Sequence, residues 1–449
     1  MNPHRRMRTA AVFSALLILA LAAVATVTPA HAVDVQRVTS PGGLTAWLVR
    51  DSRNPIISLR FAFRGGAALD PKGKEGLANL VSSTLDEGAG DLTSKAFQQE
   101  LEDKAIRLGF DAGKDTFSGN LQTLTKNRDD AFRLLKLALT KPRFDKEPVE
   151  RIRTQIMVGL KQDAEKPHTV ASRTLMTTLF PDHVYGRPTD GTEETVAKIT
   201  VDDLKGFVAR RLARDNLVIG AVGDISPEQL GQLIDDTFGA LPATAAPWKV
   251  PDVAPKFAGK TIVVDRNVPQ SAILFADAGL KREDPDFYAA YVMNRIFGGG
   301  GFTARLYSEI REKRGLAYSV GTGLYPFDAS AMLLGSAGTA NARVGETLKV
   351  LGDEWRRMAT EGVSDKELAD AITYLTGAFP LRFSSSGRIA RMLVGMQLDH
   401  LGIDYLDKRN RLIEAVTKAD IERVAKKLLD DKRLTIVVVG RPKGIETTN

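Results

Sequence analysis

Regular spacing of apolar residues divides most of the chain into strands and amphipathic helices. Short apolar or alternating runs that end near glycine or proline predict strands over residues 45–49, 56–63, 117–123 and 216–222. Apolar residues that recur three and four positions apart predict helices over residues 75–86, 97–108, 128–140, 146–165 and 200–212. This mixture of strands and helices indicates an α+β fold.

The pattern of the first half recurs in the second half. Residues 200–223 match residues 417–440, because both stretches start with T-x-x-D and close an apolar run with glycine. Residues 55–71 match residues 269–285 at nearly the same offset. Common strand and turn patterns have no reason to share an offset, so the chain is predicted to be a duplication of two similar halves.

A proline-rich stretch separates the two halves. Four prolines lie among the alanines of residues 241–260: Pro242, Pro247, Pro251 and Pro255. Closely spaced prolines favour a stiff, extended connector. We therefore predict an N-terminal domain over residues 33–240, a linker over residues 241–259 and a C-terminal domain over residues 260–449.

Residues 1–32 have the features of a secretory signal. A basic stretch over residues 4–8 precedes an uncharged apolar run over residues 9–28, and residues 30–32 read Ala-His-Ala, which fits an A-x-A cleavage site. The uncharged run is also nearly long enough for an uncleaved membrane anchor. The small residues before the site favour cleavage, so the mature chain is predicted to begin at Val33 and to be secreted, into the periplasm of a Gram-negative source. No later stretch is apolar enough to span a bilayer.

The composition is that of an ordinary globular protein and excludes several kinds of site. The 449 residues are 43% hydrophobic and 26% charged, with a formal net charge of +7. Part of that charge falls in the predicted leader, and no basic stripe interleaved with aromatic residues indicates a nucleic-acid partner. The sequence has no cysteine, which excludes disulfides, thiolate zinc sites and cysteine nucleophiles.

Residues 296–324 combine a glycine loop, a short helix and a strand. Three apolar residues recur every four positions and predict one helix face: Phe302, Leu306 and Ile310. The alternation after Gly315 predicts a strand with Tyr318 on its bulky face. Arg311 falls in the last helical turn, so the turn is expected to bring its guanidinium and the phenol of Tyr318 to one edge of a cleft.

This segment resembles the C-terminal signature of the pitrilysin/insulysin metallopeptidases (the inverzincins), including half-size members such as the mitochondrial processing peptidase subunits. There a glycine-rich loop and an Arg-Leu stretch lead into an arginine, with a tyrosine seven residues later, as with Arg311 and Tyr318 here. The resemblance implies two homologous domains, each a mostly antiparallel sheet with helices packed on one side, in a clamshell arrangement. It also implies that Arg311 and Tyr318 bind substrate near a zinc ion held elsewhere.

The zinc motif of that family is degenerate in this chain. An inverzincin needs H-x-x-E-H on one helix, where two histidines ligate zinc and the glutamate polarises its water, and a distant glutamate completes the site. Residues 76–88 keep the surrounding frame. Asn79, Ser82 and Ser83 stand at the His, Glu and His positions, and the distal glutamate position falls near Gly159. These side chains offer neither imidazole nor carboxylate, so this chain is expected to hold no zinc.

Other residues do not supply the missing chemistry. The five histidines, none of which pairs with another at the spacing of two helix ligands, are His4, His31, His168, His183 and His400. We interpret the last three as ordinary surface or core residues, and His183 falls in a stretch that resembles a structural loop of the family. The glycines of residues 298–301 lack the third glycine of G-x-G-x-x-G, so a nucleotide site is not expected.

The sequence therefore predicts the zinc-lacking chain of a heterodimeric zinc metallopeptidase. The partner would be a homologous chain that carries H-x-x-E-H and zinc, and the substrate a peptide or small unfolded protein that adds as a strand to a sheet edge. Arg311 and Tyr318 would donate hydrogen bonds to the substrate carbonyl or backbone in the partner's site. The chain alone is not expected to be active or to hold a cofactor.

Two alternatives stay open at this point. The chain could be an inactive scaffold or peptide-binding protein with no catalytic contribution, or a zinc enzyme with an unrecognised site. Taken singly, Arg311 could be a surface cation paired with Glu309 or Glu312, and Tyr318 a half-buried strand residue.

Overall fold

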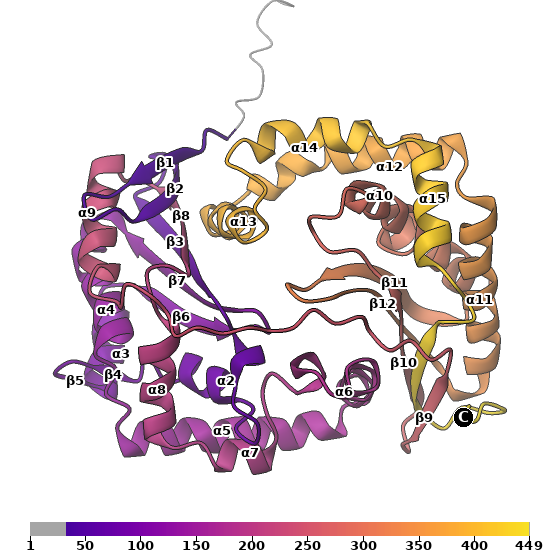
Figure 1. The fold of residues 1–449 in the computed structure, drawn as a ribbon, viewed down its shortest axis with the longest axis horizontal. Helices are drawn as coiled ribbons and strands as arrows, with labels where there is room; N and C mark the ends of the chain where they lie inside the picture. Colours follow the sequence, from indigo (N-terminus) through magenta and orange to yellow (C-terminus); the bar gives the residue numbers. More distant parts are fainter. Residues whose placement is uncertain (1–32, 449) are drawn as a thin grey trace, which may run out of the picture. The chain divides into compact units, whose positions relative to one another are not determined.

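The computed structural model describes residues 33–448, so the predicted leader over residues 1–32 lies outside the described residues. A six-stranded sheet organises the first half, in the order β1-β2-β8-β3-β7-β6 (Figure 1). Its strands are β1 (Gln36–Thr39), β2 (Thr45–Arg50), β3 (Ile56–Arg64), β6 (Arg107–Ala112), β7 (Thr116–Leu124) and β8 (Leu217–Gly223). All pairs are antiparallel except β2 with β8.

A five-stranded sheet organises the second half, in the order β11-β12-β10-β13-β9. Its strands are β9 (Thr261–Asp265), β10 (Gln270–Ala278), β11 (Ala317–Pro326), β12 (Ala331–Ala340) and β13 (Thr435–Gly440). Only β13 and β9 are parallel. Starting from the parallel pair, β9-β13-β10-β12-β11 repeats the order β2-β8-β3-β7-β6 of the first sheet, which confirms the predicted pair of similar, mostly antiparallel sheets.

Helices surround both sheets. Those of the first half are α2 (Leu77–Ser82), α3 (Ser94–Asp103), α4 (Arg128–Thr140), α5 (Lys146–Glu165), α6 (Pro167–Leu179), α7 (Glu193–Ala197), α8 (Val201–Arg211) and α9 (Pro227–Phe238). Those of the second half are α10 (Phe287–Phe297), α11 (Val344–Glu361), α12 (Asp365–Gly377), α13 (Ser386–Leu398), α14 (Tyr405–Glu414) and α15 (Lys418–Leu428). Within residues 33–448, no helix combines the length and apolar content that crossing a bilayer requires.

Short elements complete the chain. The 3-10 turns are η1 (Ala67–Leu69), η2 (Thr125–Asn127), η3 (Val184–Gly186), η4 (Gly301–Thr303), η6 (Asn341–Arg343) and η7 (Phe379–Phe383). Segment η5 (Tyr307–Glu312) is a π-helix, and β4 (Gly88–Ala89) pairs with β5 (Leu92–Thr93).

The repeat extends to hydrogen bonds at the helix starts. Thr200 caps α8 by accepting from the Asp203 backbone N–H at 3.2 Å, and Thr417 caps α15 by accepting from the Asp420 N–H at 3.2 Å. In both helices the aspartate side chain in turn accepts a hydrogen bond from the threonine backbone N–H, which completes a capping box. The T-x-x-D pattern seen in the sequence is thus the local signal that starts the same helix twice.

Each sheet also carries an aromatic ring over a glycine on the neighbouring strand. Phe61 pairs with Gly119 across β3 and β7, and Phe275 pairs with Gly335 across β10 and β12. A Cβ atom at Gly119 would lie 2.2 Å from the Phe61 ring, and one at Gly335 would lie 2.0 Å from the Phe275 ring. Both glycines are therefore required by close packing beneath a buried aromatic side chain.

Gly335→Ala is expected to lower the free energy of unfolding by about 1–3 kcal/mol, because the new methyl group overpacks the buried Phe275 ring. Chemical denaturation followed by circular dichroism would measure the change. Gly352→Ala in α11 is the matched control: its Cβ would meet nothing within 4 Å, and alanine is favoured over glycine in helices by about 1 kcal/mol. Equal destabilisation by both substitutions would contradict the packing argument.

The two halves exchange one helix each. Helix α13 of the second half packs on β3 and β8 of the first sheet, and α6 of the first half packs on β10 and β13 of the second (Figure 1). The Gln397 side chain donates to the Ile219 carbonyl at 2.9 Å, and Arg64 donates to the Leu398 carbonyl at 2.7 Å. The family resemblance implied helices on one side of each sheet. In the structure, each sheet also carries one helix that comes from the other half of the chain.

Two predicted helices end earlier than expected. The helix predicted over residues 97–108 is wrong beyond Asp103, because Ala105 has a positive φ of 49° and the edge strand β6 follows. The helix predicted over residues 75–86 is reduced to α2. Near these helix ends, the spacing of the apolar residues fits both a strand and a helix, so the sequence does not fix where each helix ends.

Residues 241–260 form neither helix nor strand. Backbone bonds hold them to both halves: Val253 N donates to the Ala329 carbonyl of the second half at 2.9 Å, and Lys256 N donates to the Leu179 carbonyl at the end of α6 at 2.8 Å. The domain boundaries on either side of this stretch remain a prediction.

Candidate substrate-binding site

Arg311 lies on the π-helical segment η5. The wider turn is shown by the Lys313 N–H, which donates to the Ser308 carbonyl five residues back at 3.0 Å. Such segments are rare and often occur at functional sites, because the extra residue per turn reorients a side chain. The predicted helix is therefore present around Arg311, with an irregular geometry that periodicity alone does not reveal.

Tyr318 lies at a bulge in the edge strand β11. Ala317 pairs with Thr339 and Ser319 with the next residue, Gly338, so Tyr318 is the extra residue. The bulge turns its side chain outward to 77% exposure. The prediction that Tyr318 shares a face with its apolar neighbours is wrong for this reason.

Three aromatic rings surround the Arg311 guanidinium. Its central carbon lies 4.9 Å from the ring centres of Tyr318 and Tyr307 and 5.9 Å from that of Phe302. Phe302 was predicted on one apolar helix face with Leu306 and Ile310, but it belongs to the separate turn η4 and is 73% exposed. The rings hold the cation by cation–π attraction, which identifies Phe302 and Tyr307 as site residues that sequence reasoning missed.

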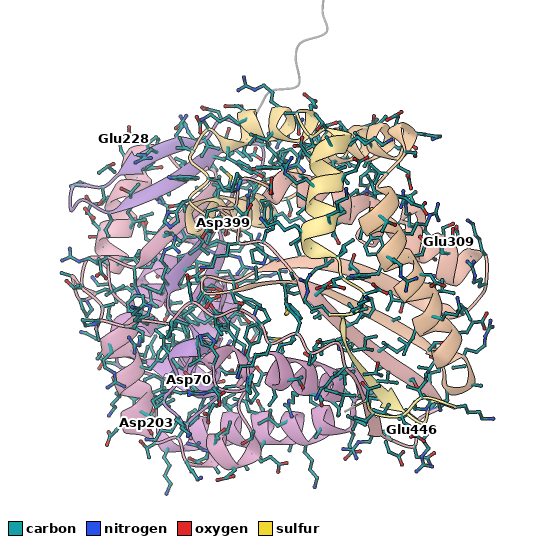
Figure 2. All side chains as sticks on the ribbon, turned by 45° about the vertical axis from the view of Figure 1, so that its right-hand side comes forward. Asp70, Asp203, Glu228, Glu309, Asp399 and Glu446 are labelled. Carbon is teal, nitrogen blue, oxygen red and sulfur yellow. The ribbon has the colours of Figure 1, made fainter. Side chains whose placement is uncertain are left out.

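The side-chain donors of Arg311 and Tyr318 have no hydrogen-bond acceptor within residues 33–448. Glu309 binds Lys313 at 2.5 Å and Arg314 at 2.6 Å, so it does not pair with Arg311. Figure 2 labels Glu309 near one edge of the second half. Across residues 33–448, neither the Arg311 guanidinium nor the Tyr318 hydroxyl has a hydrogen bond or ion pair. A cation and a phenol with free donors can bind a carbonyl or carboxylate.

The glycine loop before η5 is a packing device. The Asn294 carbonyl accepts from the Gly298 N–H at 3.0 Å, and the Thr322 hydroxyl donates to the Asn294 side chain at 2.7 Å. A Cβ at Gly298 would lie 2.3 Å from the Thr322 oxygen. The glycines thus let the end of α10 approach β11 closely.

The two serine hydroxyls of the degenerate zinc motif are bonded to the preceding turn. The Ser82 and Ser83 hydroxyls both donate to the Asn79 carbonyl, at 2.8 and 2.9 Å. The Thr84 hydroxyl likewise donates to the Leu80 carbonyl at 2.6 Å. Hydroxyls that bond back to the preceding turn compete with helical hydrogen bonds, and this explains why α2 ends at Ser82.

These positions do not fit a zinc ion. Asn79, Ser82 and Ser83 present an amide and two hydroxyls, and Gly159 in α5 has no side chain, with open space where a Cβ would be. The part of the chain that the structure describes contains no cluster of three His, Cys, Asp or Glu side chains able to hold a metal. No hydrogen bond, ion pair or ring contact within residues 33–448 joins Asn79, Ser82 or Ser83 to Arg311 or Tyr318.

Asp70 holds the start of α2 in place. Its buried carboxylate accepts from the Gly76 N–H at 2.9 Å and from the Ala78 N–H at 3.1 Å (Figure 2). Burial raises the pKa of Asp70 to about 7, although the backbone donors favour the charged form. A carboxyl group seven residues before the first residue of α2 thus accepts the hydrogen bonds that an N-cap side chain would accept.

Asp70→Asn is expected to flatten the dependence of stability on pH. Because the folded form binds the Asp70 proton more tightly than the unfolded chain does, its contribution is present below about pH 4 and is lost as pH rises toward about 7. At about 1.4 kcal/mol per pKa unit, a rise from 3.8 to about 7 makes the loss roughly 4 kcal/mol. Thermal unfolding of both proteins between pH 4 and 8 would test this, and parallel profiles would contradict it.

The remaining histidines have structural or surface positions. His183 accepts from the Tyr185 N–H at 3.2 Å and donates to the Pro251 carbonyl at 2.9 Å, which joins η3 to the proline-rich stretch. His400 contacts an Arg64 nitrogen at 3.1 Å, and His168 is exposed near the start of α6. Their placement agrees with the interpretation from the sequence.

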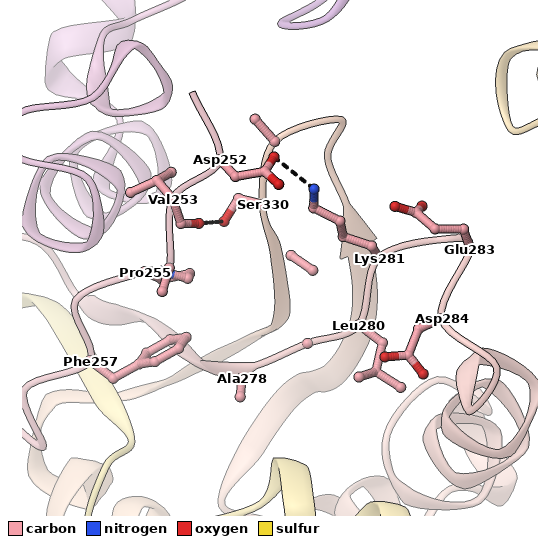
Figure 3. Close-up of a pocket in the computed structure, with 14 residues that line it drawn as sticks. Asp252, Val253, Pro255, Phe257, Ala278, Leu280, Lys281, Glu283, Asp284 and Ser330 are labelled. Atoms are coloured by element: carbon pink, nitrogen blue, oxygen red, sulfur yellow. Dashed lines mark hydrogen bonds and ion pairs between the residues drawn. The ribbon is translucent and has the colours of Figure 1, made fainter. Parts of the chain in front are cut away.

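A cavity of about 680 Å³ lies between the proline-rich stretch and the second sheet (Figure 3). Phe257 and Leu280 line it, and an ion pair of 2.8 Å between Lys281 and Asp252 spans one side. The Ser330 hydroxyl donates to the Val253 carbonyl at 2.8 Å. Asp284 also lines it and lies 3.5 Å from Lys427, and none of the predicted site residues lines it.

Comparisons with known proteins show the family and the fold of this chain. Residues 198–375 match the family model described as the peptidase M16 inactive domain. The chain is 31% identical over 336 residues to the non-peptidase homolog YmxG of Helicobacter pylori, covering 73% of this chain and 76% of that protein. It is 25% identical over 417 residues to an uncharacterized zinc protease of Streptomyces coelicolor, covering 90% and 89%.

A solved structure has the same fold. The crystal structure of a peptidase M16 inactive domain from Pseudomonas fluorescens superposes with a TM-score of 0.85 and 30% identity, and the match covers 92% of this chain and 99% of that one.

Proposed function

This chain belongs to the M16 peptidase family as an inactive, peptidase-like member, and we propose that it is the non-metal subunit of a heterodimeric zinc metallopeptidase. In this proposal Arg311 and Tyr318 bind the substrate within the partner's active site. The observation that carries it is the free pair of donors: an exposed phenol on a strand bulge beside an arginine that has no internal acceptor.

The chemistry of peptide hydrolysis gives such donors a use. Negative charge develops on the substrate carbonyl oxygen when it is attacked, and a positioned guanidinium and phenol stabilise that charge. The partner would supply the zinc-bound water and the general base, which this chain lacks at Asn79, Ser82 and Ser83. Alone, the chain would not cleave peptides.

The edge strand β11 offers a way to hold an extended substrate. It is the last strand of its sheet, with β12 as its one neighbouring strand, and its outer edge is partnered at Thr322, whose N–H donates to the Gly298 carbonyl at 3.2 Å. A peptide or small unfolded protein could add there as a further strand beside Tyr318. We place this activity outside the cytoplasm, in the periplasm of a Gram-negative source, because of the predicted leader over residues 1–32.

Isolation of the mature chain from its source cells under gentle conditions tests the proposal. We expect a second chain of similar size that carries H-x-x-E-H, about one zinc ion per pair, and cleavage that a chelator abolishes. Mass spectrometry, metal analysis and a peptide assay would show each. A lone, zinc-free and inactive chain would instead favour a scaffold or simple peptide-binding protein.

A further inference from the structure

A cavity of about 600 Å³ in the second half is rich in arginine. It is formed by the end of α12, η7, the start of α13 and one residue of α14. Four arginines line it: Arg382, Arg388, Arg391 and Arg409. None of the four forms an ion pair with any carboxylate that the structure describes. Four cations without counter-charges around one cavity give it a strong preference for anions.

Arg409 is the buried member of this group, with 4% exposure. Its guanidinium donates to the Leu375 carbonyl at 3.1 Å and to the Asn410 side chain at 3.0 Å, and it lies 3.9 Å from the centre of the Phe379 ring. These partners are all neutral. Because a buried charge is costly without a counter-ion, an anionic ligand in this cavity would be favoured.

The rest of the lining is apolar. Leu375, Phe379 and Met392 contribute side chains to the cavity, and Tyr374 and Leu381 are 54% and 73% exposed beside it. The volume is far larger than one inorganic anion needs and lies in the range of sites for many-atom ligands. The lining therefore fits a ligand that combines negative charges with an apolar group.

Close contacts connect this cavity to the surface around Arg311. The Arg295 guanidinium stacks on the Tyr374 ring at 3.7 Å and donates to the Thr303 hydroxyl at 3.1 Å. Thr303 follows Phe302, whose ring is one of the three around Arg311. A single extended chain held at Arg311 could therefore continue over Arg295 toward the arginines.

We propose that this cavity binds an acidic peptide segment, with carboxylates on Arg382, Arg388 and Arg391 and an apolar side chain against Phe379. The inference rests on the proposed function only in taking the ligand to be a peptide. It adds a preference for acidic sequence at a position separate from Arg311 and Tyr318.

Binding by the isolated mature chain tests this without the partner. The probe is a short labelled peptide in which glutamates flank a Leu-Phe pair, followed by fluorescence anisotropy. We expect its affinity to be at least about tenfold higher than that of the same peptide with lysines in place of the glutamates. We also expect its affinity to exceed that of inorganic phosphate, measured by competition. Equal affinity for the two peptides, or complete displacement by phosphate at the same concentration, would overturn the proposal.

The double variant with Arg388→Gln and Arg391→Gln should bind the acidic peptide about tenfold or more weakly, because two charge-assisted contacts are lost. Both side chains are exposed, so the fold should persist, and thermal unfolding would verify that. Arg411→Gln on α14 is the matched control, since Arg411 is exposed and does not line the cavity. The same loss in the control would show non-specific attraction and overturn the proposal. Because the probe is bound by the isolated chain, whereas the proposed function is tested by zinc content and cleavage of the pair, failure of the two proposals can be told apart.

Discussion

Replacing Arg311 with alanine is expected to lower peptide cleavage by the reconstituted pair by about 10²- to 10³-fold, the usual effect of removing one donor to a developing negative charge. The effect should fall mainly on kcat, because that charge exists in the transition state and not in the bound substrate. The structure supports this choice, since Arg311 has no acceptor within residues 33–448 and its guanidinium is positioned by three aromatic rings.

Two further variants sharpen this test. Arg311→Lys keeps the charge and loses the planar fork of donors, so it should recover only part of the activity. Arg314→Ala is the matched control three residues away, because Arg314 is occupied by Glu309 at 2.6 Å and exposed pairs contribute about 0–1 kcal/mol. Steady-state cleavage assays with zinc analysis of each pair would measure all three. Full activity of the Arg311→Ala pair would leave a scaffold role in its place.

Asp277→Ala is expected to destabilise the second half by about 3–5 kcal/mol, because it leaves buried donors and a cation without their partner. The Asp277 carboxylate is fully buried on β10. It accepts from Trp355 Nε1 at 2.9 Å, from the Asp430 N–H at 2.8 Å and from Arg433 Nε at 2.6 Å. One side chain therefore connects the sheet to α11 and to the turn before β13.

Denaturant unfolding followed by tryptophan fluorescence would measure this loss, since Trp355 is itself one of the donors. Asp265→Ala is the matched control, because its 2.8 Å ion pair with Arg441 is largely exposed and should contribute about 0–1 kcal/mol. If the two variants lose equal stability, the buried carboxylate does not have the role assigned to it. Peptide binding at Arg311 should also weaken in Asp277→Ala, through loss of the fold that carries η5.

Local patterns in the sequence were sufficient to predict the elements whose structure depends on residues close together in the chain. The helix predicted over residues 128–140 and the one over residues 146–165 have the bounds of α4 and α5, because helical periodicity and turn residues act within a few positions. The duplicated capping boxes at Thr200 and Thr417 are of the same kind. The missing zinc ligands were also evident, since the identity of a side chain decides whether it can ligate.

Contacts between distant parts of the chain decided the remainder. The exchange of α6 and α13 between the two halves depends on which sheet surface is left uncovered, and no periodicity reports that. Tyr318 becomes exposed through a bulge in its pairing with β12, and a bulge is a property of two strands together. In the sequence, Asp277 is an ordinary polar residue. Only the fold places three hydrogen-bond donors from distant parts of the chain next to its carboxylate.

The sequence by itself therefore determined that this protein is a duplicated, mostly antiparallel α+β chain whose metal motif has lost its ligands, because spacing and residue type carry that information. Only the tertiary structure decided which polar side chains remain without a partner. Arg311 and Tyr318 were candidates from the sequence. The absence of an acceptor for either within residues 33–448, and the gathering of four arginines without ion pairs around one cavity, depend on how all the other charges pair in the folded chain.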